Sequence, residues 1–388
     1  MKSKKIYLEP AWKLHSLYNS LIQNPPDGYE IISSQSLDNK VFKSASKMRQ
    51  AYRVLELLDN GMPSTLIKSR LERFKKIPKE TDLTYACGHL VFRKEPWIVD
   101  MEYLSILVGF NPKHFQTYKK LIESTLSSDY CKKIITWFEA SKRTILLNLD
   151  CSNFESKLEV VSFAGKKRDF TKIVNNDKIK LLFVNSGNIP LQFYYKGGME
   201  LLEAFSILSR KFGNLELVIR SDMPKDLKDK FKSVKNLKII NKVVPWDVLE
   251  NEFKTADIFL YPTYSSEDMV VFDAMSYELP VIITDVFANS EVVENGKTGF
   301  VISRAKTGVY YYREDFIGDT GRPESQFAKL PPDTTIVQNL VNQTTILIEN
   351  KEMRRQMGKA GRWEVEHGKF SIERRNEKLK RIFDEATA

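Results

Sequence analysis

Residues 255–302 have the sequence TADIFLYPTYSSEDMVVFDAMSYELPVIITDVFANSEVVENGKTGFVI. Three short runs of apolar and β-branched residues, which start at Asp257, Pro280 and Gly299, alternate with segments of helical spacing. Continuous apolar strands separated by single helices are typical of a parallel sheet that is buried on both faces. The stretch therefore predicts the strand–helix repeat of an α/β domain.

The same alternation extends upstream of this stretch. Three further apolar runs, KIKLLFV, LELVIR and LKII, begin at Lys178, Leu215 and Leu237, with helical segments such as GMELLEAFSILSRKF between them. Ligands of such sheets bind at the carboxyl ends of the strands, where loops lead into helix N-termini. Functional loops are therefore expected after the last residues of the strands, which are Val184, Arg220, Ile240, Pro262 and Thr284.

The first half of the chain alternates less regularly, with apolar runs KIYLEP, YEIIS, LTYAC, PWIVDME and KKIITWF. The charged stretch GKKRDFTKIVNNDK, residues 165–178, lacks the apolar periodicity of its neighbours and predicts a linker. At 388 residues the chain exceeds the usual size of one hydrophobic core. We therefore predict an α/β protein of two Rossmann-like lobes, residues 1–170 and 171–365. A C-terminal helix, residues 366–388, is expected to pack back on the first lobe.

The composition narrows the functional classes. The net charge of +10 suits an anionic partner, such as a nucleotide diphosphate or a membrane surface, or simply a solvated surface rich in Lys and Arg. The chain has no basic motif with interleaved aromatic residues, so no nucleic-acid partner is expected. No apolar stretch approaches the roughly 18 to 20 residues that cross a bilayer. Three scattered cysteines, Cys87, Cys131 and Cys151, suit a reducing cytoplasm and have no metal-ligand spacing.

Two motifs carry a family resemblance. Pro262-Thr263, Asp273-Ala274-Met275 and Gly296-Lys297-Thr298-Gly299 resemble the Pro-Ser, Glu-Ala-Met and Gly-x-Thr-Gly elements of the retaining GT-B glycosyltransferases of group 1, also called family 4. KIKLLFV, followed by Lys196-Gly197-Gly198, resembles the family's phosphate-binding strand, loop and helix start. The resemblance covers residues 178 to 303 and the tail segment MRRQMGKAGR. It implies a two-lobed hexosyltransferase that uses a nucleotide-diphosphate sugar donor and, as is usual in the family, no metal or other cofactor.

Lys196 and Gly197 lie at a predicted helix start, where unpaired N–H groups and the helix dipole favour an anion. Negative charge builds on the diphosphate when the sugar–nucleotide bond breaks, so a preorganised cation there is worth about 3 to 4 kcal/mol. We therefore expect Lys196 to be catalytic and both residues to bind the diphosphate. The alternative is an exposed lysine beside a helix-starting glycine. The chain has no Asp-x-Asp pair, so no bridging metal is expected.

The resemblance also assigns roles near the start of the next helix. It implies that Asp273 holds the ribose hydroxyls of the donor, and an acid set among Val, Phe and Ala needs a partner. The family's other glutamate corresponds to Ser265 here, so the nearby Glu267 is expected either to contact the donor sugar or, with Asp268, to favour the helix N-terminus. The backbone amides expected to face the diphosphate are those of Asp268, Met269 and Val270.

In the first lobe, KEPWIVDMEYL resembles the family's Pro-Val-Val segment, which is followed by a histidine that lines the cleft. Counting from Pro96 places Glu102 at that position. A carboxylate there would hold an acceptor hydroxyl or stabilise oxocarbenium-like charge, and the alternative is an ordinary strand-end acid. His89 is a weaker candidate, because a lone histidine is more often structural.

The sequence departs from the family at two places. Asn185-Ser186-Gly187-Asn188 stands where an arginine commonly follows the first strand of the second lobe. Ser221-Asp222 stands where the next strand is usually followed by Gly-x-Gly. These departures leave room for reduced activity.

The sequence therefore predicts a cytoplasmic glycosyltransferase of glycan biosynthesis that acts with retention on a glycan or lipid-linked acceptor. Basic segments with apolar residues at helical spacing, such as STLIKSRLERFKKIPK, residues 64–79, leave peripheral association with the inner face of an anionic membrane open. Two other functions stay open. One is a sugar-nucleotide epimerase that uses no acceptor, and the other is a catalytically degenerate binding protein on a GT-B frame.

Overall fold

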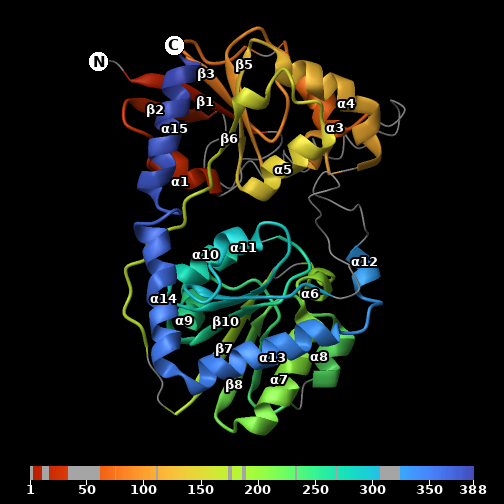
Figure 1. The fold of residues 1–388 in the computed structure, drawn as a ribbon, viewed down its shortest axis with the longest axis vertical. Helices are drawn as coiled ribbons and strands as arrows, with labels where there is room; N and C mark the ends of the chain where they lie inside the picture. Colours follow the sequence, from red (N-terminus) through yellow and green to blue (C-terminus); the bar gives the residue numbers. More distant parts are fainter. Residues whose placement is uncertain are drawn as a thin grey trace. The chain divides into compact units, whose positions relative to one another are not determined.

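The structure is a computed structural model that describes residues 3–10, 17–33, 62–74, 76–110, 112–173, 177–185, 189–231, 234–266, 269–305 and 324–388. Within these ranges the chain forms two compact units, the first from residues up to Ala164 and from Ile372 onward, the second from Gly165 to Ser371. Each unit is built on one six-stranded parallel sheet with helices packed against it (Figure 1). The predicted α/β class with two Rossmann-like lobes is confirmed.

The sheet of the first unit has the strand order β2-β1-β3-β4-β5-β6. Its strands are β1 (Lys4–Pro10), β2 (Tyr29–Ser33), β3 (Leu83–Cys87), β4 (Trp97–Met101), β5 (Cys131–Thr136) and β6 (Leu158–Val160). Its helices are α1 (Leu17–Gln23), α3 (Ser64–Glu72), α4 (Pro112–Ser127), α5 (Glu139–Asn148), α15 (Ile372–Ala386) and the short 3₁₀ turns η2 (Leu104–Val108) and η3 (Glu155–Lys157).

The sheet of the second unit has the strand order β12-β11-β10-β7-β8-β9. Its strands are β7 (Ile179–Val184), β8 (Leu215–Arg220), β9 (Leu237–Ile240), β10 (Ile258–Tyr261), β11 (Val281–Thr284) and β12 (Gly299–Ile302). Its helices are α6 (Gln192–Tyr195), α7 (Gly198–Lys211), α8 (Lys225–Phe231), α9 (Trp246–Thr255), α10 (Met269–Ser276), α11 (Asn289–Val292), α12 (Glu324–Phe327), α13 (Thr334–Glu349) and α14 (Lys351–Glu366). Helix α7 packs against α13, and α10 packs against α14.

The apolar runs of the sequence form the buried centres of both sheets. All four residues of β10 and of β11 are buried, as a strand covered on both faces requires. Each of the six runs predicted in the second half is a strand of one sheet, with every pairing parallel. Among the described residues of the first half, one strand was not predicted, β6, because its three residues are too few to show a pattern.

The last helix, α15, belongs to the first unit although it follows α14 of the second unit in the chain. Its buried residues Leu379, Ile382 and Phe383 join a core cluster with residues of β1, β2 and β3. Tyr29 and Tyr85 stand edge-on to the ring of Phe383, with centroids 5.1 and 6.2 Å away. The core of the first unit therefore includes side chains of the C-terminal helix.

Two further features bear on the setting of the protein. The helices that the structure describes include none with both the length and the apolar character of a membrane span. Cys87, Cys131 and Cys151 are all buried free thiols.

Candidate functional site

The strand order of the second sheet marks one place for a ligand. Counted from β9, the order β9-β8-β7-β10-β11-β12 is that of the doubly wound dinucleotide-binding fold, in which the chain changes direction between its first and fourth strands. Here those strands are β7 and β10, and the loops that leave their carboxyl ends diverge. Ligands of open α/β sheets bind in the crevice at such a switch point. The site predicted around Lys196 follows β7, and the segment Pro262–Ser266 follows β10.

Lys196 joins the loops after these two strands. Its Nζ donates a hydrogen bond of 2.6 Å to Oγ of Ser265, which lies 69 positions later in the sequence. The ammonium also lies over the rings of Tyr195 and Tyr261, 5.5 and 5.6 Å from their centroids. Because Lys196 is only 5% exposed, the alternative of an exposed surface lysine is wrong. A buried cation held in place at a switch point is suited to an anionic ligand.

Gly197 sets the geometry of this lysine. It has φ +79°, in the left-handed region, and it is the N-cap residue that directly precedes α7. A Cβ atom at this position would lie 1.9 Å from the carbonyl oxygen of Pro262, so no other residue fits without a backbone shift. The glycine therefore allows the start of α7 to approach the end of β10 and brings Lys196 against Ser265.

Asn289, which the sequence did not single out, fixes the loop that carries Ser265. The side chain is fully buried at the start of α11, and its Nδ2 donates to the carbonyl oxygens of Thr284 and Ser265 at 2.9 and 3.2 Å. Thr263 adds to the network, because its Oγ1 accepts a hydrogen bond of 3.0 Å from the backbone N–H of Ser265. A buried asparagine gives no local pattern in the sequence, so only the fold reveals it.

Asp273 lies on α10, and its partner comes from the linker. Nη2 of Arg168 lies 2.6 Å from Oδ1 of Asp273, and the guanidinium also lies over the ring of Trp246, 4.5 Å from its centroid. Burial raises the pKa of Asp273 above its usual value, although the Arg168 guanidinium opposes part of that shift. The carboxyl side chain keeps 25% of its surface exposed, so it remains accessible to a second donor.

Helix α10 begins at Met269, as the sequence predicted, and Met269 and Val270 are half-buried in its first turn. Glu267 and Asp268 lie outside the described residues, so their predicted contacts remain predictions.

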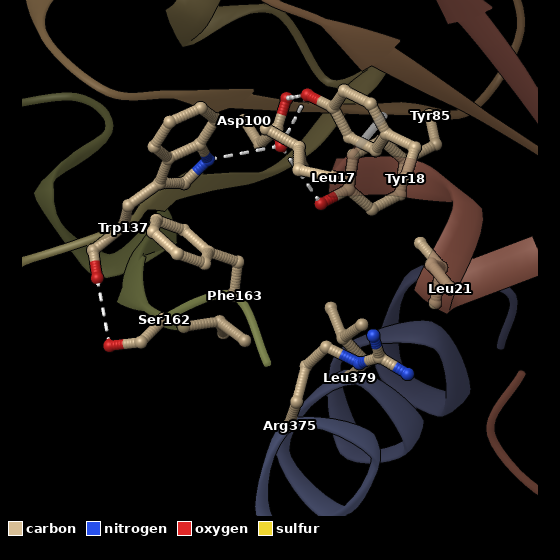
Figure 2. A pocket seen from close by; sticks show the side chains of 11 residues that line it. Leu17, Tyr18, Leu21, Tyr85, Asp100, Trp137, Ser162, Phe163, Arg375 and Leu379 are labelled. Carbon is tan, nitrogen blue, oxygen red and sulfur yellow. Dashed lines mark hydrogen bonds between the residues drawn. The ribbon is translucent and has the colours of Figure 1, made fainter. Parts of the chain in front are cut away.

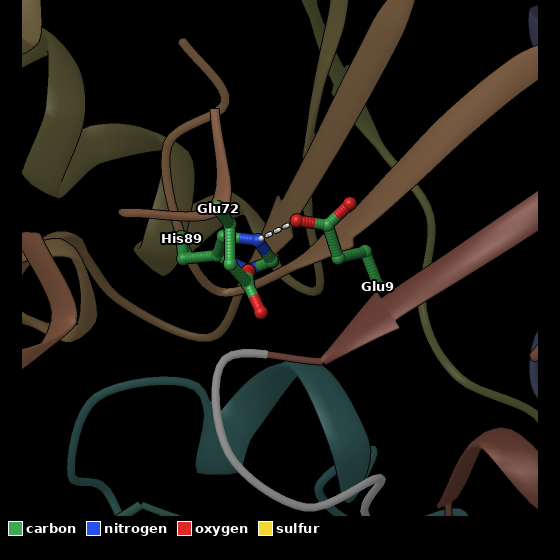
Figure 3. A group of neighbouring side chains, drawn as sticks. All are labelled: Glu9, Glu72 and His89. Carbon is green, nitrogen blue, oxygen red and sulfur yellow. Dashed lines mark hydrogen bonds and ion pairs between the residues drawn. The ribbon is translucent and has the colours of Figure 1, made fainter. Parts of the chain in front are cut away.

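In the first unit, Glu102 directly follows β4 and is half-buried. The order β2-β1-β3-β4-β5-β6 places the switch point of this sheet between β1 and β3. Glu9 in β1 and His89 after β3 meet there, with Oε1 and Nε2 3.3 Å apart, and Glu72 lies beside them (Figure 3). Their ligand atoms lie within 4.8 Å of one another, as a metal site would need.

The charges of this cluster are already balanced. Arg93 pairs with Glu9, and Nζ of Lys68 lies 3.2 Å from Glu72. Burial alone would raise the pKa of Glu9, but hydrogen bonds from His89 and Arg93 hold it well below its usual range. His89 is 1% exposed, and its Nδ1 lies 3.5 Å from the carbonyl oxygen of Cys87. The cluster is therefore a neutralised buried network, which agrees with a structural histidine.

A pocket of the first unit lies elsewhere, between α1, the sheet and α15 (Figure 2). Asp100 accepts hydrogen bonds there from Tyr18, Trp137 and Tyr85, at 2.8, 3.1 and 3.3 Å. Burial raises the pKa of Asp100 to about 6. None of the residues predicted for the donor or the acceptor lines this pocket.

Part of the second unit matches a known family model. Residues 180–309 match the family model of the glycosyl transferases group 1. A comparison with curated protein sequences gave no match.

Several solved structures share the fold over nearly the whole chain. HepE of Anabaena, in complex with UDP-glucose, is similar with a TM-score of 0.58 and 14% identity, covering 98% of this chain and 99% of HepE. Sucrose-phosphate synthase of Thermosynechococcus elongatus is similar with a TM-score of 0.59 and 12% identity, covering 98% of each chain. A glycosyltransferase of Rickettsia africae is similar with a TM-score of 0.56 and 13% identity, covering 99% and 98%. The two Rossmann-like units and these structural likenesses give the chain the GT-B fold, and its residues 180–309 resemble the glycosyl transferases group 1.

Proposed function

We propose that the protein transfers a sugar from a nucleoside-diphosphate donor to an acceptor hydroxyl, with retention of the anomeric configuration. In the reaction, the bond between the anomeric carbon and the β-phosphate oxygen breaks, and the acceptor oxygen replaces the phosphate and gives up its proton. The single observation that most supports this transfer is the buried Lys196, which donates a hydrogen bond to Ser265 at the switch point between β7 and β10. A fixed cation at that point would stabilise the charge that develops on the diphosphate.

The donor would lie over the carboxyl ends of β7 and β10. Lys196 and Gly197 would hold the diphosphate, with the amides of Asp268, Met269 and Val270 at the start of α10, where the helix dipole favours an anion. Asp273 would accept the ribose hydroxyls through the part of its carboxylate that Arg168 leaves exposed. Glu267 would contact the donor sugar, and Glu102 of the first unit would serve the acceptor.

The donor base and sugar are best sought by a screen. Because the HepE structure contains UDP-glucose, the UDP sugars come first, followed by GDP and ADP sugars. We expect no metal requirement, since the chain has no Asp-x-Asp pair. Activity that survives EDTA would agree with this, and activity that returns only with added divalent ions would contradict it. We further propose a glycan or lipid-linked acceptor and a cytoplasmic enzyme that associates peripherally with anionic membranes.

The decisive experiment incubates the protein with the panel of nucleotide sugars, with and without candidate acceptors. Release of nucleotide that depends on an acceptor supports transfer, and NMR of the product gives its anomeric configuration. An isomerised donor without acceptor would replace the proposal by an epimerase. Binding of a donor without any turnover would replace it by a binding protein.

A further inference from the structure

The carboxyl ends of β7 and β8 carry polar side-chain atoms that have no hydrogen-bond partner among the residues that the structure describes. They are Nδ2 of Asn185, Nε of Arg220 and Oγ of Ser221. Asn185 is 6% exposed and Ser221 is not exposed at all. Buried polar groups are nearly always hydrogen-bonded, and leaving one unpaired is destabilising. Three such atoms on two neighbouring strand ends therefore indicate a place where a polar ligand completes the structure.

Arg220 reaches across from β8 to β7. Its Nη1 donates a hydrogen bond to the carbonyl oxygen of Asn185, and the N–H of Asn185 donates to the carbonyl oxygen of Arg220 at 2.8 Å. The guanidinium therefore lies at the end of β7, the first strand of the switch point. The loop that begins at Asn185 leads on through α6 to Lys196.

The charge of Arg220 is not neutralised by a carboxylate within the described residues. Burial lowers the pKa of its guanidinium. Arg168 in the same unit differs, because it pairs with Asp273 at 2.6 Å. A half-buried cation without an anion is costly in the free protein, and an anionic ligand removes that cost.

Arg220 also lies near the place where the sequence lacks the arginine that is common in the group 1 family. An arginine commonly follows the strand equivalent to β7 in the group 1 family, and Asn185 begins that loop here. Arg220 comes from the neighbouring strand, yet its guanidinium lies at the end of β7. Ser221, which stands where a glycine is usual, adds a buried hydroxyl beside it.

We propose that Arg220, assisted by Asn185 Nδ2 and Ser221 Oγ, binds the diphosphate of the donor and supplies the cation that the loop after β7 lacks. This inference rests on the proposed function. Lys196 meets the diphosphate from the β10 side of the β7 end and Arg220 from the β8 side, so a ligand with two linked phosphates suits both. The planar guanidinium offers paired N–H donors that match phosphate oxygens.

The test is calorimetric titration of the full-length protein with UDP, GDP and ADP, and with the corresponding nucleosides. In Arg220→Gln, binding of the preferred nucleoside diphosphate should weaken about 10- to 100-fold, while binding of its nucleoside stays the same. Arg220→Lys should lie between the two. Arg210→Gln, which changes an exposed arginine in the last turn of α7, is the matched control and should bind as the wild type does.

The outcomes separate the two proposals. Unchanged diphosphate binding in a folded Arg220→Gln protein overturns the role of Arg220, and so does an equal loss for diphosphate and nucleoside, which would indicate a structural role. If the wild type binds none of the diphosphates, the proposed function itself fails. Melting temperatures without ligand report folding. Should Arg220→Gln not fold, Ser221→Ala removes no charge and should still weaken diphosphate binding selectively, whereas unchanged binding would overturn its part in the site.

Discussion

At the scale of single residues, the candidate site depends on a lysine and on the glycine that follows it. Lys196 is buried and reaches Ser265 over 69 positions of sequence, while Gly197 makes that approach possible. Lys196 would stabilise the negative charge that develops in the transition state, whereas Gly197 allows the backbone approach that positions the lysine. These two roles lead to different expected effects of substitution.

Lys196→Ala should lower turnover by about 100-fold or more, because it removes a preorganised cation from the developing diphosphate charge. Steady-state kinetics with the donor found in the screen measure this effect. Lys211→Ala, which changes an exposed lysine paired with Glu349 in the last turn of α7, is the control and should leave turnover unchanged. A folded Lys196→Ala protein with the wild-type rate would exclude Lys196 from the mechanism.

Gly197→Ala should destabilise the second unit by at least about 2 kcal/mol, because it adds left-handed backbone strain and a clash with the backbone of Pro262, directly after β10. Gly296→Ala is the matched control. Gly296 has a similar φ of +81°, but no atom lies within 4 Å of the added Cβ, so only the strain of about 1 kcal/mol applies. Denaturant unfolding of both variants compares the two costs. Equal losses would show that the contact with Pro262 does not constrain position 197.

At the scale of elements, β4 carries a buried carboxylate that holds three other segments. Asp100 accepts hydrogen bonds from Tyr18 of α1, Tyr85 of β3 and Trp137 after β5. Three donors reduce the cost of burying this charge but do not cancel it, because burial still raises the pKa to about 6. The stability of the first unit should therefore depend on the protonation of Asp100, and so on pH.

The stability of the first unit should fall as pH rises from about 4 to about 7. The folded state holds its Asp100 proton up to a pKa of about 6, whereas the unfolded chain loses it near 3.8, so the unfolded state binds fewer protons in this window. The contribution is roughly 3 kcal/mol, present below the unfolded pKa and lost by pH 7. Unfolding curves of the wild type and Asp100→Asn across this range measure it. A difference between the two proteins that does not vary with pH would contradict the assignment.

At the scale of the whole molecule, the first unit is made from both ends of the chain. Helix α15 follows the helices of the second unit, but Leu379, Ile382 and Phe383 are buried in the core of the first sheet. Arg375 adds to this attachment, since its guanidinium donates to the carbonyl oxygen of Asn24 at 2.9 Å and to Oγ of Ser20 at 3.0 Å. Within the described residues, the chain therefore passes from one unit to the other after Ala164 and after Ser371.

Deletion of residues 372–388 should unfold the first unit selectively. Exposure of three fully buried apolar side chains alone costs about 1.5–3 kcal/mol each, which is comparable to the whole stability of a domain. Limited proteolysis followed by mass spectrometry would show cleavage between residues 3 and 164, while the second unit stays protected. A truncated protein with an intact first unit would show that α15 is dispensable for that fold.

The sequence by itself determined the strands of the second sheet, the start of α10 at Met269 and the Lys196-Gly197 motif. Each of these features depends on residues that are neighbours in the sequence, which form an apolar run or a helix-start signal. Five strands of the first sheet were also predicted from the sequence, whereas β6 was too short to show a pattern. The charged character of Lys196 was evident, but its burial was not.

The tertiary structure decided what depends on residues far apart in the chain. It brought Lys196 to Ser265, Arg168 to Asp273, Arg220 to the end of β7 and α15 to the first sheet. The physical reason is that periodicity and propensity report the local backbone, whereas strand order and burial arise from the packing of the whole sheet. The sequence therefore predicted a class of ligand, and only the fold showed which side chains lie together at the switch point of the second sheet.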